Sequence, residues 1–190
     1  MKITFFGLGN MGLPMARNLG AAGFVLKGYD IRQAGRVAAG KAGVVCCDTL
    51  DDSLKDADVL ITMLPDGDCV RDVLLNDKGV LRIRPHLIMD CSTIAVEMAR
   101  TLGRVCRDNG VMWLDAPVSG GITGADAATL TFMCGGVPAA LAYAKPLLEY
   151  FLRLFHFIGE KRIHVLLPLL LNFLVRPSIH RNSNIKHTTM

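Results

Sequence analysis

Three glycines near the amino terminus have the spacing of a dinucleotide-binding turn. The segment Gly7-Leu8-Gly9-Asn10-Met11-Gly12 directly follows an apolar run over residues 2–6 and precedes a helical pattern. In such a turn the first glycine permits a tight bend, the second lets the backbone approach a pyrophosphate, and the third lets the helix pack closely. The free N–H groups and the dipole at the helix start favour phosphate charge. We therefore predict that Gly7, Leu8, Gly9, Asn10, Met11 and Gly12 hold a pyrophosphate.

An acidic residue follows the next apolar run, as the dinucleotide pattern requires. The carboxylate of Asp30 could accept hydrogen bonds from the ribose hydroxyls of adenosine, and it would repel a 2′-phosphate, which favours NAD over NADP. Arg32 is the opposing signal, because an arginine at this position can hold that phosphate. We assign Asp30, Ile31 and Arg32 to the cofactor site. The alternative is a glycine-rich turn in an ordinary α/β domain.

Alternating strands and helices must position these residues. Their alternation predicts the α/β class, with a Rossmann-type, doubly wound and mostly parallel sheet whose ligand-binding edge lies at the carboxyl ends of the strands. We expect Thr93 to cap the helix over 95–108. The expected strands are 2–6, 25–30, 44–47, 59–64, 87–90, 111–115 and 129–134, and the expected helices lie between Gly12 and Gly23 and at 33–42, 51–57, 68–75, 95–108 and 138–150.

Composition divides the chain into two unequal parts. With 190 residues, of which 51% are hydrophobic and 20% charged, the chain can build one full domain with a sizeable core. Residues 1–150 carry fifteen Lys/Arg and sixteen Asp/Glu, whereas 151–190 carry six Lys/Arg and a single acid. We predict a dinucleotide-binding domain over 1–158 and a tail over 159–190 that is apolar, basic and poorly ordered.

Several classes of protein are not indicated. The six cysteines lack C-x-x-C or zinc spacing, so we expect buried reduced thiols and assign no metal ligand. Met1 directly precedes the first strand, leaving no room for a leader, so we expect a cytoplasmic location. The apolar run 163–175 is broken by Pro168 and is shorter than the ~20 residues of a membrane span. We expect neither a nucleic-acid nor a membrane partner, and a membrane-surface role for the basic tail is the least favoured alternative.

Three further motifs follow the glycine turn in order: Met63-Leu64-Pro65, Asp90-Cys91-Ser92-Thr93-Ile94 and Asp115-Ala116-Pro117-Val118-Ser119-Gly120-Gly121. Together with residues 7–19 they resemble the 3-hydroxyisobutyrate dehydrogenase family, the β-hydroxyacid dehydrogenases related to 6-phosphogluconate dehydrogenase. The resemblance covers residues 1 to about 158. It implies reversible hydride transfer between NAD and a small 3-hydroxy acid, of the kind used in valine degradation.

The resemblance also implies roles at matching positions. Leu64 and Pro65 would flank the adenosine and ribose side of the cofactor, Cys69 would lie near it, and Thr93 would lie beside the nicotinamide. The substrate carboxylate would be held by Ser119, Gly120 and Gly121. Glycines do expose backbone N–H donors, and a small anion needs several of them. A plain loop before a helix is the alternative for residues 119–121, and helix capping alone is the alternative for Ser92 and Thr93.

The chain departs from the family pattern after its Gly159-Glu160 pair. The family places a general acid/base lysine there, in Gly-x-Gly-x-x-x-Lys-x-x-Asn-Asn, on the helix that leads into an all-helical, dimerising second domain. Here Pro168 falls near the position of the lysine, and proline cannot transfer a proton. We therefore assign no catalytic residue and expect the second domain to be missing.

Two readings of the whole chain follow from this departure. The first is an enzyme, an NAD-dependent 3-hydroxyacid dehydrogenase by descent, although the missing lysine argues against activity of this chain alone. The second is a non-catalytic NAD(P)-binding fragment. In either case a missing domain would leave apolar surface exposed, and the expected positions are Leu147, Leu148, Phe151, Phe155 and 166–171.

Overall fold

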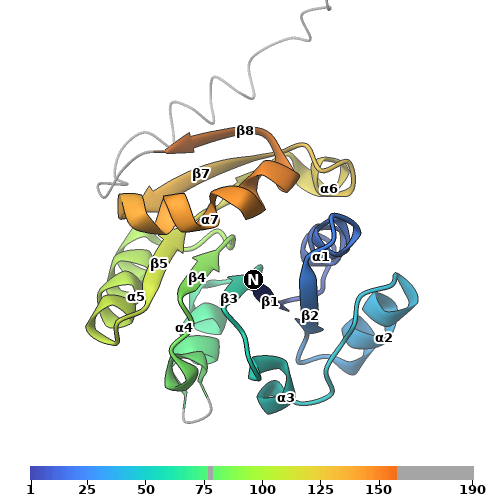
Figure 1. Cartoon of the computed structure of the whole chain (residues 1–190), viewed down its shortest axis with the longest axis horizontal. Coiled ribbons are helices and arrows are strands. Elements are labelled where there is room, and N and C mark those ends of the chain that lie inside the picture. Colours follow the sequence, from blue (N-terminus) through green and yellow to red (C-terminus); the bar gives the residue numbers. More distant parts are fainter. Residues whose placement is uncertain (77–78, 158–190) are drawn as a thin grey trace, which may run out of the picture.

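Eight strands make one sheet in the computed structural model, which describes residues 1–76 and 79–157 (Figure 1). The strand order is β2-β1-β3-β4-β5-β7-β6, with β8 paired to β7. Neighbours from β2 to β5 are parallel, whereas β7 is antiparallel to β5 and β6. The predicted α/β class and mostly parallel sheet are confirmed. The strands are β1 Lys2–Phe6, β2 Val25–Tyr29, β3 Val59–Thr62, β4 Leu87–Asp90, β5 Met112–Asp115, β6 Val118–Ser119, β7 Leu130–Gly136 and β8 Leu152–Phe157.

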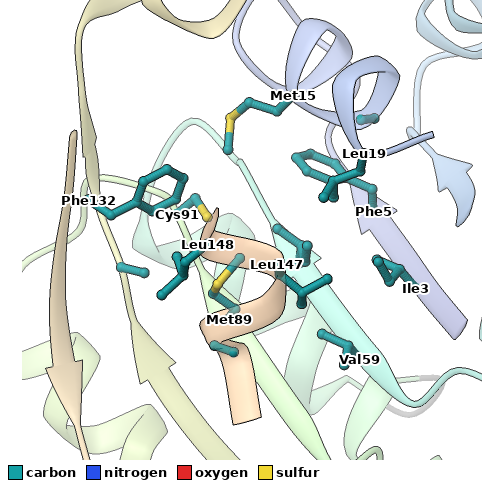
Figure 2. Close-up of a cluster of buried hydrophobic side chains, with 14 of the residues drawn as sticks. Ile3, Phe5, Met15, Leu19, Val59, Met89, Cys91, Phe132, Leu147 and Leu148 are labelled. Carbon is teal, nitrogen blue, oxygen red and sulfur yellow. The ribbon is translucent and has the colours of Figure 1, made fainter. Parts of the chain in front are cut away.

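Helices cover both faces of the sheet because its central strands are apolar on both sides. In β1, Ile3 and Phe5 belong to one buried core and Phe6 to the other, as the two-residue period of a strand requires. The first core, shown in Figure 2, packs against α1, α2, α6 and α7, and the second against α3, α4 and α5. The helices are α1 Gly12–Ala21, α2 Gln33–Lys41, α3 Leu50–Leu54, α4 Gly67–Leu75, α5 Val96–Asp108, α6 Gly121–Asp126 and α7 Pro138–Phe151, with a 3-10 turn η1 at Val80–Ile83.

The sheet register aligns the points at which the four motifs begin. Phe6 of β1 lies opposite Thr62 of β3, which lies opposite Asp90 of β4, which lies opposite Asp115 of β5. Each of these residues ends its strand, so the segments that follow emerge at one edge. The carboxyl edge of a parallel sheet is where ligands bind in this architecture.

The predicted strand over 44–47 is wrong. The segment makes one isolated parallel bridge, between Gly28 and Cys46, beside the outer strand β2. Two backbone hydrogen bonds hold it, from Gly28 N–H to the Val45 carbonyl at 2.8 Å and from Cys47 N–H to the Gly28 carbonyl at 3.0 Å. The pairing is therefore too short to form a strand.

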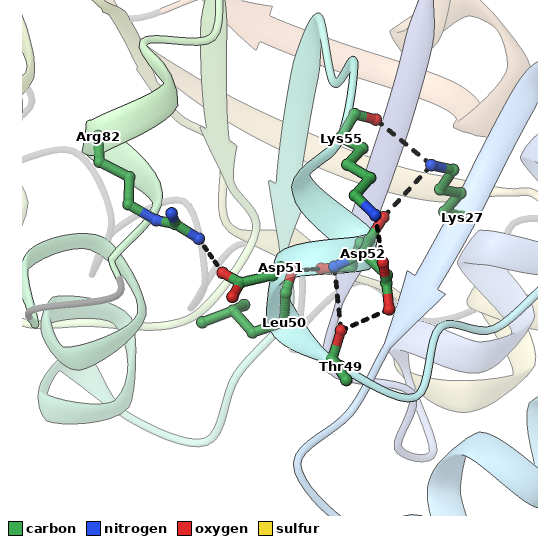
Figure 3. Close-up of polar contacts among 8 residues, drawn as sticks. Lys27, Thr49, Leu50, Asp51, Asp52, Lys55 and Arg82 are labelled. Carbon is green, nitrogen blue, oxygen red and sulfur yellow. Dashed lines mark hydrogen bonds and ion pairs between the residues drawn. The ribbon is translucent and has the colours of Figure 1, made fainter.

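Polar contacts hold the next segment against β2 (Figure 3). The Thr49 hydroxyl caps α3 by accepting a hydrogen bond from Asp52 N–H at 3.1 Å. The ammonium group of Lys27 in β2 donates to the carbonyls of Asp52 and Lys55, both at 3.3 Å. This short helix thus joins the edge of the sheet through side chains instead of a strand.

Two other expectations about the helices are wrong. Helix α5 begins after Ala95, and no side chain caps it, so Thr93 is not its cap. Leu147 and Leu148 are fully buried, because α7 lies against the sheet and carries both side chains into the first core (Figure 2). Among the other positions expected to be exposed, the side chains of Phe151 and Phe155 and the run 166–171 lie outside the described part of the chain, as does the predicted tail.

The cysteines are all free, and three of them differ from expectation. Cys91, Cys106 and Cys134 are buried, but Cys46, Cys47 and Cys69 are only half-buried. Across residues 1–76 and 79–157, the helices are too short or too polar for any to cross a bilayer.

Candidate functional site

The glycine turn after β1 leaves no room for side chains at two positions. Gly7 has a φ of +89°, and a Cβ atom there would lie 2.3 Å from the carbonyl oxygen of Met63. A Cβ atom on Gly12 would lie 1.8 Å from the carbonyl oxygen of Gly7. The start of α1 is thus pressed against the turn, and both turn and helix lie beside the segment that leaves β3.

The start of α1 is open to an anion. Its N-cap, Met11, makes no side-chain capping bond, and the first turn contains no acidic residue. The first N–H groups of a helix lack intrahelical acceptors, and the helix dipole makes this end positive. Within 4 Å and among residues 1–76 and 79–157, a Cβ atom on Gly9 would meet only the Arg32 guanidinium, at 3.6 Å from Nη2. The backbone near Gly9 can therefore be approached closely, which fits a phosphate group.

Asp30 has a structural role in addition to the ligand-binding role that the sequence indicated. Its carboxylate is buried, and Oδ2 accepts a hydrogen bond from Leu8 N–H at 2.9 Å. Oδ1 accepts from the Arg32 N–H at 2.8 Å and from Arg32 Nε at 3.3 Å. A Cβ atom on Gly35 would lie 2.9 Å from Cγ of Asp30, so this glycine makes room for the acid. The acid at the end of β2 therefore ties the glycine turn to the start of α2.

These contacts keep Asp30 charged. Burial by itself would raise its pKa, but the hydrogen bonds from Arg32 and Leu8 and the charge of Arg32 outweigh it, so the pKa is lowered. A carboxylate has about four lone-pair positions, and residues in the described part of the chain use three of them here. Counted over those residues, one position is left for a ligand hydroxyl. The adjacent Ile31 side chain is 86% exposed.

Ser92 connects the motifs that follow β3 and β4. Its buried hydroxyl accepts a hydrogen bond from Leu64 N–H at 2.9 Å, and its own N–H donates to Oδ1 of Asp90 at 3.0 Å. The same carboxylate oxygen accepts from the Thr62 hydroxyl at 2.8 Å. Sequence reasoning did not give Ser92 and Asp90 this connecting role. A serine two residues after a strand-ending acid, beside a second strand end, is the signal that could have indicated it.

The remaining residues predicted for the cofactor lie around this connection. Leu64 is half-buried, whereas Pro65 and Thr93 are exposed. Cys69 lies in the first turn of α4, where its N–H donates to the capping carboxylate of Asp66 at 2.8 Å. The hydrogen bond to Asp66 raises the pKa of the Cys69 thiol, with burial adding to the effect, so this sulfur is a neutral thiol.

The predicted carboxylate loop joins β6 to α6. Ser119 ends β6, and Gly120 and Gly121 have φ values of +132° and +62°. The carbonyl of Gly120 accepts the Gly124 N–H at 3.0 Å, which closes the first turn of α6. The segment is a tight loop before a helix, and it presents exposed backbone at both glycines.

A cavity of about 430 Å³ brings part of these residues together. Sequence reasoning identified Leu8, Gly9, Asn10 and Arg32 in its lining but missed its third wall, which Ile122 and Asp126 of α6 provide. The other residues predicted for cofactor and substrate lie outside this lining: Gly7, Met11, Gly12, Asp30, Ile31, Leu64, Pro65, Cys69, Thr93, Ser119, Gly120 and Gly121. The other lining residues are Leu13, Pro14, Ala34, Gly35 and Ala38.

A larger cavity of about 690 Å³ runs along α5 beside Trp113 and Gly136. None of the residues predicted for cofactor or substrate lines it. The smaller cavity therefore marks the candidate site, because the glycine turn and the start of α1 line it together with Arg32 and Gly35, which contact the buried acid Asp30.

Known proteins share this sequence pattern and this fold. The family model for the NAD binding domain of 6-phosphogluconate dehydrogenase matches residues 2–159. NAD-dependent L-serine dehydrogenase of Pseudomonas aeruginosa is 45% identical over 150 residues, which are 78% of this chain and 50% of that protein. The chain thus spans about half the length of the curated relatives it matches.

Two solved structures illustrate the similarity. Mycobacterium tuberculosis 3-hydroxyisobutyrate dehydrogenase with L-serine superimposes with a TM-score of 0.79 at 42% identity, covering 83% of this chain and 54% of that one. Psf3 in complex with NADP+ and 2-OPP superimposes with a TM-score of 0.82 at 28% identity, covering 90% of this chain and 62% of that one.

Proposed function

Since this chain belongs to the family of the NAD binding domain of 6-phosphogluconate dehydrogenase and is similar to 3-hydroxyisobutyrate dehydrogenases, we propose that it is the cofactor-binding part of a 3-hydroxyacid dehydrogenase. The observation that carries the proposal is the uncapped start of α1, open at Gly9 and adjacent to the buried acid Asp30. That arrangement suits a dinucleotide, whose phosphates need N–H donors and whose ribose needs an acceptor.

Each part of the cofactor is contacted by a different group of residues in this proposal. The backbone N–H groups of the turn between Gly9 and Gly12 hold the pyrophosphate, and the free lone pair of Asp30 accepts from an adenosine ribose hydroxyl. The exposed side chain of Ile31 offers an apolar surface beside the adenine. Leu64 and Pro65, with Cys69 nearby, form the opposite side. Thr93 lies beside the nicotinamide.

NAD is the preferred cofactor in this proposal. The Arg32 side chain is 70% exposed, but its Nε lies 3.3 Å from the Asp30 carboxylate, which would face any 2′-phosphate. Binding NADP would require Arg32 to exchange this partner for the phosphate, with the negative charge of Asp30 still close by. The L-serine dehydrogenase relative is named for NAD, and the Psf3 structure contains NADP+, so relatives of this fold use both.

The substrate in this proposal is a small 3-hydroxy acid. Its carboxylate is held by the hydroxyl of Ser119 and the N–H groups of Gly120 and Gly121, since a small anion requires several such donors. The nicotinamide ring, when bound, supplies the hydride acceptor for oxidation of the substrate carbon. Among residues 1–76 and 79–157 we assign no group that takes the hydroxyl proton.

The two readings of the chain differ in whether it can turn over a substrate. We expect NAD to bind and no turnover to follow, because the family's lysine motif is not present in the sequence after Gly159. A non-catalytic NAD(P)-binding fragment is thus the second candidate. Turnover of 3-hydroxyisobutyrate by the purified chain would exclude that second candidate.

A calorimetric titration tests the cofactor site. In Gly9→Ala, the added methyl group meets only Arg32 among the described residues within 4 Å but blocks the approach of a pyrophosphate, so we expect NAD binding at least ~10-fold weaker with an unchanged fold. Gly40→Ala is the matched control: Gly40 lies near the end of α2, and its Cβ atom would meet no atom of the described residues within 4 Å. Equal NAD affinity in both variants, or no NAD binding by the wild-type chain, would contradict the proposal.

A further inference from the structure

Helix α6 begins in the proposed carboxylate loop and ends against the helix of the glycine turn. The side-chain amide of Asn18 in α1 donates to the carbonyl of Ala125 at 2.7 Å and makes a longer contact with that of Asp126 at 3.5 Å. Arg17 adds an ion pair with the carboxylate of Asp126 at 3.3 Å. Figure 1 shows α6 next to α1, although the residues in contact are more than a hundred positions apart in the chain.

The loop 119–121 and α6 form one packed unit. The N–H of Gly124 donates to the carbonyl of Gly120 at 3.0 Å, and the N–H of Thr129 donates to that of Gly124 at 2.9 Å. The buried side chain of Leu130 lies within 3.2 Å of the place where a Cβ atom on Gly120 or Gly124 would be. A displacement of α6 would therefore displace the loop as well.

The same helix forms a wall of the candidate cofactor cavity. Asn10 and Leu13 from the start of α1 line that cavity together with Ile122 and Asp126 from α6. A molecule seated at the start of α1 thus lies next to the helix that carries the loop. The distance between a cofactor and a hydroxy acid depends on how α6 is held.

We propose that Asn18 is a positioning residue, whose amide fixes the loop 119–121 relative to the pyrophosphate site at the start of α1. The inference rests on the proposed function, since it concerns the loop assigned there to the substrate carboxylate. The amide carries the effect because it is half-buried and bonds to backbone carbonyls. The Arg17–Asp126 pair is exposed at both ends, and such pairs contribute little.

Hydrogen exchange of the whole chain tests this role. In Asn18→Ala we expect the amides of residues 119–128 to exchange about five- to ten-fold faster than in the wild type, because one hydrogen bond holding α6 is lost. Asn109→Ala is the matched control: its amide also donates to one carbonyl, that of Val105 at 2.9 Å, but at the end of α5. It should leave exchange at 119–128 unchanged. Asn18→Gln retains the donor and should restore part of the protection.

Added NAD extends the test to the coupling between the sites. At equal NAD occupancy, exchange at 119–128 should slow in the wild type and in Asn109→Ala, and should slow less in Asn18→Ala. Unchanged exchange at 119–128 in Asn18→Ala without nucleotide would overturn the inference, as would equal slowing by NAD in all three proteins. Arg17→Met should behave as the wild type, and an effect as large as that of Asn18→Ala would refute the assignment to the amide. The calorimetric titration, by contrast, decides whether NAD binds, so failure of the proposed function is recognised separately.

Discussion

The N–H of Leu8 donates a hydrogen bond to Oδ2 of Asp30 at 2.9 Å, so the acid at the end of β2 fastens the glycine turn at the end of β1. The same carboxylate accepts hydrogen bonds from both the N–H and the Nε of Arg32, the N-cap residue of α2. Asp30 is thus part of the structure of the turn as well as a candidate ligand of the cofactor. One buried charge therefore stabilises both the glycine turn and the start of α2.

Stability should depend on the charge of Asp30. Hydrogen bonds from Arg32 and Leu8 lower its pKa in spite of burial, so its folded pKa lies below the unfolded value of 3.8. The stabilisation is therefore fully present at pH values above 3.8 and is lost as the pH falls through the lower, folded pKa. In Asp30→Asn, we expect a loss of about 1–3 kcal/mol in the free energy of unfolding at neutral pH, which shrinks in acid. Urea unfolding between neutral pH and pH ~3 measures it.

A suitable control for that series is Asp108→Asn, because Asp108 is an exposed acid at the end of α5. This change should shift the unfolding free energy by less than about 0.5 kcal/mol at neutral pH. If Asp30→Asn and wild type lost stability in parallel on acidification, the role of the Asp30 charge would be refuted.

Two glycines of α1 should respond in opposite ways to the same change. In Gly12→Ala the new methyl group would lie 1.8 Å from the Gly7 carbonyl oxygen, so we expect a loss of more than about 3 kcal/mol or no folded protein. In Gly20→Ala no atom lies within 4 Å, and the higher helix propensity of alanine should add up to about 1 kcal/mol. Chemical unfolding of both variants gives the comparison. A Gly12→Ala protein as stable as Gly20→Ala would show that α1 is not pressed against the turn.

Removing the hydroxyl of Ser92 should loosen the segment after β3. In Ser92→Ala the N–H of Leu64 loses its acceptor in a buried place, which costs about 1–3 kcal/mol. Thr93→Val should change the unfolding free energy by less than about 0.5 kcal/mol, because Thr93 is exposed and does not cap α5. Thermal and urea unfolding distinguish the two. A larger loss in Thr93→Val than in Ser92→Ala would restore the capping role that the sequence predicted.

The cysteines should fall into two groups by reactivity. Burial raises the pKa of Cys106 and of Cys134 to about 12, and it raises that of Cys91 well above the ordinary value, so these stay neutral and inaccessible near pH 7. The pKa values of the half-buried Cys46, Cys47 and Cys69 are raised as well, so it is their accessibility that distinguishes them. Iodoacetamide should label these three slowly in the native protein, and all six cysteines after denaturation. Peptide mass spectrometry reads out each site. Labelling of Cys91 at the rate of Cys69 would contradict the burial of Cys91.

The sequence by itself determined where the candidate cofactor-binding segments and most helices and strands lie along the chain. The glycine spacing, the acid after the second strand and the two-sided apolar strands are local patterns, and they require nothing beyond backbone sterics and the period of a strand. For that reason, the α/β class and most of the element positions were predictable. A short segment such as 44–47 was misassigned because its apolar residues satisfy the pattern of a strand, although its pairing is limited to one bridge.

Tertiary structure decided which groups meet. The bond from Leu8 to Asp30 spans 22 positions, the bond from Leu64 to Ser92 spans 28, and the bond from Asn18 to Ala125 spans 107. Contacts at such separations depend on how whole helices and strands pack, which no local period records. The burial of Leu147 and Leu148 also results from long-range packing, because α7 packs against the sheet of its own domain. Local sequence thus indicated the candidate ligands of the cofactor, and long-range packing placed Ile122 and Asp126 of α6 beside the glycine turn.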